Sequence, residues 1–528
     1  MGIPLRGPQP DIEGTLLIDI KCLIEFSMDI SEKKYILAID QGTTSSRAVI
    51  FDYSGQIKHI AQTPIAQVYP NPGWVEESPD EIWETQLRMC RACLTESRVS
   101  SLDIAAIGIA NQRETTIAWD RLSGAPICNA IVWQDRRTAD FCTSLEERGL
   151  SALISSKTGL VIDPYFSASK IWWMLQNVEG SSQTAKSGDL LVGTVDSWLI
   201  WNLTGGRVHS TDYTNASRTM LANIHTSDWD DDLLGLFDIP KHILPEIKPS
   251  SGFIGVTDKK WFGNEIPICG VSGDQQAALF GQKCVHPGNI KTTYGTGCFI
   301  LMSTGDKPVV SDGGLLTSLA AGTTAKPGYV LEGSVFNGGS TVQWLRDELQ
   351  IISSSDDIER LALEVNDSGG LVFVPAFTGL GAPLWDPYAR GLLIGINRGT
   401  SKAHVARAAL EGIAQQCVDV IEYMEKDSGI AVKEMKVDGG ASVNNLLMQV
   451  QSDISGIPIL RPSMVETTAL GAAFLAGLGA GFWKDVGSIG NADNQFDTFY
   501  PQGSEVARRS MRESWTKAVH RSRAWVDA

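Results

Sequence analysis

The stretch YILAIDQGTTSSRAVIFD, residues 35–52, limits the fold of this chain more than any other. Two apolar runs flank a polar turn, and this composition predicts two strands joined as a hairpin. The turn contains Gly42 and four hydroxyl side chains, and Arg47 follows it. Because Gly42 lets backbone N–H groups approach a ligand, the turn is suited to holding phosphate oxygens. Asp40 ends the first run, where it is placed to hold Mg²⁺ directly or through water. An ordinary polar hairpin is the alternative interpretation.

The strand, turn, strand pattern returns at residues 289–303, NIKTTYGTGCFILMS. Strands alternate with helix-like segments around both hairpins, which predicts the α/β class. A duplication of this kind predicts two similar lobes with a cleft between them. We expect four regions: a poorly ordered N-terminal extension (1–32), a first lobe (33–282), a second lobe (283–482) and a helical tail packed on the second lobe (483–528).

Composition excludes several classes of protein. The hydrophobic fraction of 43% and the charged fraction of 20% are typical of a soluble globular chain. The formal net charge of -17 repels nucleic acid and anionic membranes, and no stretch is long and apolar enough to span a bilayer. Nine scattered cysteines suit a reducing cytoplasm better than a disulfide framework. The first ~27 residues lack the features of a signal peptide; they are either a loose extension or an upstream start, because Met28 precedes the first strand.

A second chemistry-bearing stretch runs from an apolar strand, residues 266–271, into SGDQQ and a helix-like segment from Ala277. This order puts Asp274 at the carboxyl end of a strand, where ligand groups gather in open α/β sheets. A carboxylate there can accept a proton from a substrate hydroxyl. The position also allows Asp274 to be an ordinary helix N-cap.

Three further turns suit a nucleotide. The Gly-Thr-Gly turn at 295–297 is suited to the far side of a polyphosphate, and no P-loop motif is present. Residues 332–340, EGSVFNGGS, lead into a helix through Gln343. At residues 437–444, VDGGASVN, a strand turns through two glycines into a helix; Gly440 allows close backbone approach and Asn444 can hydrogen-bond an adenine or ribose. Each turn alone is also compatible with a plain strand–helix connection, but together they indicate a two-lobed enzyme that closes on a nucleotide.

At this point the chain resembles the FGGY family of carbohydrate kinases, in the superfamily of actin and the heat-shock chaperone ATPases. The resemblance covers about residues 33–525, with DQGTTSSR, NQRETT, VWQDRRT, GLVIDPYFS, GTVDSWLIW, DYTNASRTML, SGDQQAALFGQ, TYGTGCF, PAFTGLGAP and DGGASVNN in family order. NQRETT and DPYF with GDQQ point to members that phosphorylate glycerol.

The resemblance implies two actin-like, ribonuclease H-like lobes with an ATP and substrate cleft between them. It also implies ATP-dependent conversion of glycerol to sn-glycerol 3-phosphate in the cytoplasm, by a homodimer or homotetramer.

The resemblance also implies roles for matching positions. The glycerol pocket would comprise Arg113, Glu114, Trp133, Tyr165, Asp274, Gln275 and Phe299. The ATP contacts would be Thr43, Thr44, Ser45, Arg47, Thr296, Gly339, Gln343, Gly440 and Asn444. Asp274 would be the general base for the terminal hydroxyl, and Asp40 with Asp274 would position Mg²⁺. Phosphoryl transfer of this kind depends mainly on positioning and charge neutralisation.

One segment departs from relatives that are regulated. Residues 256–267, VTDKKWFGNEIP, lack the Gly-rich, Arg-bearing loop that binds fructose 1,6-bisphosphate in one bacterial group. In another group a phosphorylated histidine stands where this chain has Lys260. We therefore expect neither control. A kinase for another polyol or sugar and a non-catalytic ATP-binding module remain the competing hypotheses.

Overall fold

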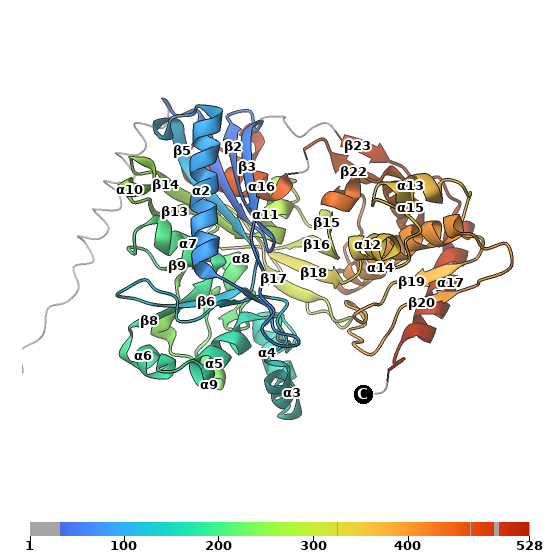
Figure 1. Ribbon diagram of the computed structural model, residues 1–528, viewed down its shortest axis with the longest axis horizontal. Coiled ribbons are helices and arrows are strands. Elements are labelled where there is room, and N and C mark those ends of the chain that lie inside the picture. The colour runs from blue at the N-terminus through green and yellow to red at the C-terminus, as the bar shows by residue number, and fades with distance from the viewer. Residues whose placement is uncertain (1–31, 325, 465, 490–495, 527–528) are drawn as a thin grey trace, which may run out of the picture.

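The computed structural model describes residues 32–324, 326–464, 466–489 and 496–526 as two α/β lobes that lie side by side (Figure 1). Nearly all of the expected N-terminal extension lies outside the described residues. Within the described residues, no helix combines the length and the apolar character needed to cross a membrane.

The first lobe is built on a six-stranded sheet. In spatial order its strands are β13 (Ser251–Val256), β14 (Pro267–Gly273), β5 (Ile104–Asn111), β1 (Tyr35–Gln41), β2 (Ser45–Asp52) and β3 (Ile57–Pro64). β1 and β2 pair antiparallel, with Asp40 opposite Arg47, so the predicted hairpin is confirmed. β1, β5 and β14 are parallel, and Gln41, Asn111 and Gly273 end them in one register. The segments that follow these strands therefore begin at one edge of the sheet.

The second lobe repeats this topology. Its seven strands, in spatial order, are β17 (Leu316–Leu319), β18 (Tyr329–Val335), β16 (Cys298–Gly305), β15 (Ile290–Tyr294), β21 (Met435–Asp438), β22 (Ile459–Pro462) and β23 (Phe496–Phe499). β15 and β16 form the predicted second hairpin, and β15, β21 and β22 are parallel, as β1, β5 and β14 are. The prediction of a duplicated α/β fold is confirmed.

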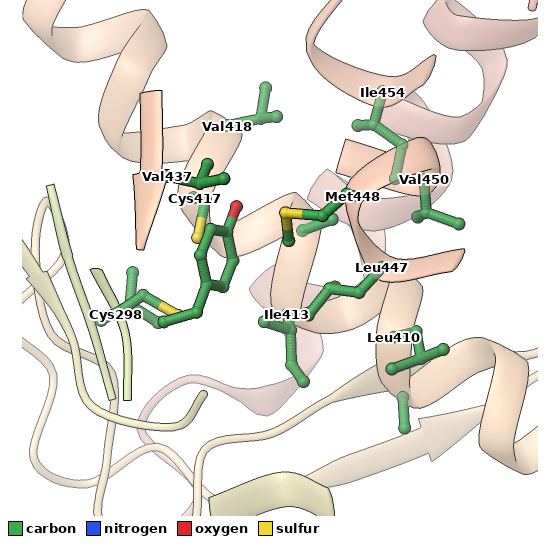
Figure 2. Close-up of a cluster of buried hydrophobic side chains, with 14 of the residues drawn as sticks. Cys298, Leu410, Ile413, Cys417, Val418, Val437, Leu447, Met448, Val450 and Ile454 are labelled. Atoms are coloured by element: carbon green, nitrogen blue, oxygen red, sulfur yellow. The ribbon is translucent and has the colours of Figure 1, made fainter. Parts of the chain in front are cut away.

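Helices cover the outer faces of both sheets. α2 (Pro79–Ser97) packs on β2 and β3, and Ser78 caps it, because its side chain accepts a hydrogen bond from the N–H of Glu81. On the second lobe, α14 (Lys402–Ser428) and α15 (Asn445–Ser455) bury Ile413, Cys417 and Met448 against the sheet (Figure 2).

A long insertion separates β5 from β13 and forms the lower part of the first lobe in Figure 1. It contributes β7 (Ala130–Ile131), β6 (Thr116–Asp120) and β8 (Leu190–Thr194) to a small sheet, and β4 (Glu76–Glu77), which precedes β5 in the chain, pairs with β7 at the edge of this sheet. Its helices are α3 (Ala139–Glu147), α4 (Ser151–Thr158), α5 (Ser167–Asn177), α6 (Ser181–Ser187), α7 (Val195–Leu203), α8 (Tyr213–Ala216) and α9 (Asp231–Phe237), whereas α10 (Lys259–Phe262) joins β13 to β14. β7 ends at Ile131, so Trp133 lies just beyond it.

Two helices join the lobes. α11 (Asp274–Gly281) follows β14, α16 (Thr467–Gly479) follows β22, and the two pack against each other (Figure 1). Glycine permits this contact, because a Cβ on Gly471 would lie 1.8 Å from the carbonyl oxygen of Ala277. α16 also packs on β5, where a Cβ on Gly108 would lie 2.1 Å from the carbonyl oxygen of Ala472. Although its residues fall in the range expected for the second lobe, this Ala-rich helix is apolar all round and is buried against the first-lobe sheet.

The C-terminal helix α17 (Glu505–Ser522) packs on the second lobe. Trp515 is buried, and its indole N–H donates to Asp419 of α14 at 2.8 Å. Arg512 pairs with the same carboxylate at 2.6 Å. Trp483, which comes earlier in the expected tail, instead donates to the carbonyl of Tyr53 in the first lobe.

Candidate active site

Asp274 lies at the edge of the first-lobe sheet, facing cations from both lobes. Gly273 takes the N-cap position of α11 and Asp274 is its first residue, so the carboxylate is not the helix cap. One oxygen accepts from the N–H of Gln275 at 2.7 Å and lies 3.4 Å from Nε of Arg113. Burial raises the pKa of Asp274, while Arg113 and Lys291 oppose that shift. A partly buried carboxylate beside cations is suited to accept a proton from a bound hydroxyl.

Arg113 is held by the second lobe. Its two terminal nitrogens donate to the two carboxylate oxygens of Glu332, on β18, at 2.6 and 2.8 Å. Burial alone would raise the pKa of Glu332, but Arg113 and Arg218 lower it to about 2. The sequence alone predicted no role for Glu332, because residues 332–340 were interpreted only as a glycine turn that leads into a helix. A charged residue inside an otherwise apolar strand is the signal that could have found it.

Glu114 adopts a strained backbone next to Arg113. Its φ is +62°, in a region that residues other than glycine rarely adopt. Arg218, which follows α8, donates to its carboxylate at 2.5 Å. Burial raises the pKa of Glu114, and Arg218 opposes this most strongly. Arg218 stands in the motif DYTNASRTML, yet sequence reasoning assigned it no role.

Three aromatic side chains gather beside these charges. The ring of Trp133 lies 5.6 Å from that of Tyr165 and 6.3 Å from that of Phe299, measured between centroids. Phe299 comes from the second lobe, so this wall spans both lobes. The indole N–H of Trp133 donates to the hydroxyl of Thr43 at 3.0 Å. The structure thus brings this aromatic wall up to Thr43 in the turn of the first hairpin, the first of the two turns expected to bind phosphate.

The segment that carries Tyr165 is fixed by a buried lysine. Nζ of Lys170 donates to the carbonyls of Pro164, Tyr165 and Phe166 at 2.8, 2.6 and 3.2 Å. Burial lowers the pKa of Lys170 to about 8, and Glu114 opposes the shift. An ammonium that donates to three carbonyls determines where Tyr165 lies.

Gln275 is tied to the second lobe by Lys291 of β15. Nζ of this fully buried lysine donates to the side-chain oxygen of Gln275 at 2.9 Å and to Thr293 at 2.5 Å. Thr293 in turn donates to Asp438. Burial lowers the pKa of Lys291, whereas Asp438 and Asp274 raise it. The oxygen of Gln275 is therefore engaged, which directs the amide nitrogen elsewhere.

The first phosphate turn carries a cation between carboxylates. Nη1 of Arg47 lies 3.6 Å from Asp40 and contacts Glu466, which precedes α16. Burial raises the pKa of Asp40 to about 7; Arg47 opposes the shift, and Asp274 and Glu466 add to it. In the turn itself, Thr44 is exposed and Ser45 is half-buried. Asp40 and Asp274 thus influence one another, as two carboxylates sharing one site do.

The second phosphate turn contacts the start of α12 (Gly339–Asp347). The N–H of Gly339 donates to the carbonyl of Gly295 at 2.8 Å, and a Cβ on Gly339 would lie 2.7 Å from that oxygen. Thr296, at the tip of the turn, is exposed, as is Gln343 one turn along α12.

The DGG turn lies on the neighbouring strand of the same sheet. Gly440 is exposed, and a Cβ there would meet nothing within 4 Å. Asn444 caps α15, because its side-chain oxygen accepts from the N–H of Leu447 at 2.8 Å. Asn444 therefore acts as a helix cap through its side-chain oxygen. Its amide nitrogen is the atom left to donate a hydrogen bond to a nucleotide.

The duplicated lobes, meeting at Asp274, define the class of this chain: a two-lobed, actin-like sugar kinase rather than a P-loop enzyme. Among solved structures it is similar to Plasmodium falciparum glycerol kinase with ADP (TM-score 0.88, 37% identity, covering 92% of this chain and 98% of that one). It is also similar to a gluconate kinase from Lactobacillus acidophilus (TM-score 0.83, 25% identity, covering 92% and 97%).

Among curated proteins, "Glycerol kinase 2" of Thermotoga maritima is 56% identical over 495 residues, 93% of this chain and 99% of that protein. "Glycerol kinase" of Rhodopirellula baltica is 55% identical over 496 residues, 94% and 92% of the two chains. The models of the N-terminal and C-terminal domains of the FGGY family of carbohydrate kinases match residues 35–281 and 290–480. The chain therefore belongs to the FGGY family of carbohydrate kinases.

Proposed function

We propose that this chain transfers the γ-phosphoryl group of ATP to a terminal hydroxyl of glycerol, forming ADP and sn-glycerol 3-phosphate. The observation that carries the proposal is the position of Asp274. Its carboxylate lies 3.4 Å from Nε of Arg113, and its charge raises the pKa of Asp40, at the end of β1 beside the first phosphate turn. The identity of 53–56% to glycerol kinases over nearly the whole chain supports glycerol as the acceptor.

The polar side chains of the pocket form hydrogen bonds to the hydroxyls of glycerol, and the aromatic side chains pack on its carbon chain. The polar side chains of the pocket are buried, namely Arg113, Glu114 and Gln275. A ligand that lacks one hydroxyl would therefore leave one of these buried polar groups without a hydrogen-bond partner. Trp133 and Phe299 supply the apolar surface. Asp274 accepts the proton of the attacking hydroxyl as the new O–P bond forms, and the bond from the γ-phosphorus to the leaving ADP oxygen breaks.

The nucleotide lies between the two phosphate turns. Thr43, Thr44, Ser45 and Arg47 of the first lobe and Thr296 of the second would bind its phosphates, while Gly339, Gln343, Gly440 and Asn444 would bind the rest. Exposure of Thr44, Thr296, Gln343 and Gly440 supports this assignment, because their side chains or backbone are accessible to a ligand. Closure of the lobes excludes water and limits ATP hydrolysis.

Mg²⁺ fits the donor set at Asp40 and Asp274. Asp40 and Asp274 would hold the ion, because two carboxylates that repel one another suit a divalent cation that keeps several of its waters. When bound, Mg²⁺ neutralises charge on the phosphates. Nη1 of Arg47 already contacts Glu466 and lies 3.6 Å from Asp40, so a phosphate would compete with these two carboxylates for the guanidinium.

The test is ADP release from MgATP with glycerol, and separately with dihydroxyacetone, xylulose, ribulose and gluconate. We expect strong release with glycerol alone. Release that depends on a different polyol would retain the mechanism and overturn the pocket assignment. Slow release that no acceptor stimulates would favour a non-catalytic ATP-binding module.

We also propose that the protein is cytoplasmic and assembles as a homodimer or homotetramer. Free thiols support the location, because every cysteine within the described residues is unpaired. Light scattering of the purified protein tests the assembly.

A further inference from the structure

Four buried charged side chains beside Asp274 form a closed ring of alternating sign. Arg113 pairs with Glu332 at 2.6 Å, Glu332 with Arg218 at 3.3 Å, Arg218 with Glu114 at 2.5 Å, and Glu114 with Arg113 at 3.8 Å. Each side chain is at most 2% exposed. Buried charges are stable only when they are paired in this way, so the position of each member depends on the others.

Two members of this ring, Arg113 and Glu114, belong to the glycerol pocket of the proposed function. We propose that the other two, Arg218 and Glu332, are positioning residues that orient Arg113 and Glu114 for recognition of the glycerol hydroxyls. This inference rests on the proposed function and deepens it, because it names residues that determine which polyol the pocket accepts.

Glu332 fixes the guanidinium of Arg113. Both terminal nitrogens of Arg113 donate to Glu332, at 2.6 and 2.8 Å, and this bidentate pair sets the plane of the group. Nε then faces Asp274 at 3.4 Å and Glu114 at 3.8 Å. Gln276 also accepts from one terminal nitrogen at 3.0 Å, but only Glu332 engages both, so the plane of the guanidinium depends chiefly on Glu332.

Arg218 fixes Glu114 and supports Tyr165. Its Nε donates to the Glu114 carboxylate, and its guanidinium lies 5.2 Å from the ring centroids of Tyr165 and Phe166. Glu114 needs such support, since its φ of +62° persists only where the surroundings determine it. The hydroxyl of Ser167 adds a hydrogen bond to the carbonyl of Glu114 at 3.0 Å.

The ring also crosses between the lobes. Arg113, Glu114 and Arg218 belong to the first lobe, whereas Glu332 lies on β18 of the second. Both terminal nitrogens of Arg218 are buried without a hydrogen-bond partner among the described residues, although Nη2 lies 3.3 Å from Glu332. At this distance the pair lacks only a favourable angle for a hydrogen bond, and two of the four links in the ring depend on Glu332 of β18. The pocket is therefore complete only with the second lobe in contact.

The experiment uses Glu332→Gln, Arg218→Met and the conservative Arg218→Lys. The matched control is Asp419→Asn, which breaks the pair with Arg512 far from the pocket, between α14 and α17. For each full-length variant the measurements are kcat, KM for glycerol, KM for ATP and thermal stability. The ratio of kcat/KM for glycerol to that for 1,3-propanediol, which lacks the middle hydroxyl, measures hydroxyl recognition.

We expect Glu332→Gln and Arg218→Met to raise KM for glycerol about tenfold or more, with KM for ATP changed less than about twofold. The glycerol to propanediol ratio should fall about tenfold, because misaligned polar groups no longer distinguish the two ligands. Arg218→Lys should restore part of the ratio, since it keeps a cation at Glu114. Asp419→Asn should lower stability and leave both KM values and the ratio unchanged.

The inference is overturned if the three pocket variants lose stability like the control and keep the wild-type KM and ratio. If the two charge-removing variants fail to fold, Arg218→Lys decides alone: an unchanged ratio overturns the inference and a reduced one supports it. If the wild-type protein does not phosphorylate glycerol, the proposed function is refuted instead. The kcat of the wild-type protein with glycerol distinguishes this outcome from failure of the inference.

Discussion

Replacing Gly471 with alanine should destabilise the junction of the two lobes and slow turnover. The added Cβ would lie 1.8 Å from the carbonyl oxygen of Ala277, whereas ordinary contact begins near 3.4 Å. α11 and α16 must therefore separate by roughly 1.5 Å in a close-packed interior. α16 has little room to retreat, because a Cβ on Gly108 of β5 would already meet Ala472 at 2.1 Å on another side.

The magnitude follows from two opposing effects. Overpacking costs about 1–3 kcal/mol, or more where the backbone is rigid. Alanine in a helix regains about 1 kcal/mol relative to glycine. Because the clash involves backbone rather than a flexible side chain, we expect a net loss of about 2 kcal/mol or more in the free energy of unfolding. Turnover should fall by up to about 100-fold, because α11 begins with Asp274 and small misplacements of reacting groups are costly.

The assay is denaturant unfolding and kcat, with Gly235→Ala as the matched control. Gly235 lies in α9, and a Cβ there would meet nothing within 4 Å, so this variant should gain about 0.5–1 kcal/mol. If Gly471→Ala is as stable and as active as Gly235→Ala, the close approach of α11 and α16 described above is wrong.

The remaining predictions concern the site and its regulation. Asp274→Asn should keep glycerol binding, measured by calorimetry, and lose most of kcat, about 10²–10⁴-fold, because the base is gone; near-normal turnover would refute that role. Arg113→Ala should mainly raise KM for glycerol, by about tenfold or more, and an unchanged KM would count against the pocket. Asp40 has a folded-state pKa raised to about 7 by burial, so its ionisation opposes folding increasingly as pH rises from its ordinary pKa of 3.8 toward 7. Asp40→Asn should therefore gain thermal stability over wild type as pH rises through this window in the absence of Mg²⁺, and a variant less stable than wild type at pH 8 would contradict this. Millimolar fructose 1,6-bisphosphate should leave kcat unchanged, and clear inhibition would show that the interpretation of residues 256–267 is wrong.

Local patterns explain what could be predicted. Both hairpins and the Ser78 cap depend on residues close together in the chain, where turn chemistry and apolar runs suffice. The fold class followed from repetition of one such pattern. α16 illustrates the limit: its composition indicates burial on all sides, but not that the burying surface belongs to the other lobe.

The ring of charges illustrates the same limit within the site. Arg218 and Glu114 are 104 positions apart, and Arg113 and Glu332 are 219 positions apart. Neither Arg218 nor Glu332 follows a glycine turn or ends a strand of the first sheet, so no local rule marks them. The signal for Glu332 was its charge inside an apolar strand, and the signal for Arg218 was its place in the motif DYTNASRTML.

The sequence by itself determined the duplicated α/β fold, the two phosphate-type turns and the residues placed at strand ends, because short-range sterics and hydrophobic periodicity decide these features. Only the tertiary structure decided which charges pair. It joined Arg113 to Glu332 and Gln275 to Lys291 across the lobes, and it placed Asp40 near Asp274. The reason is that the cost of burying a charge is set by whatever partner the folded chain brings within a few ångströms, regardless of separation in the sequence.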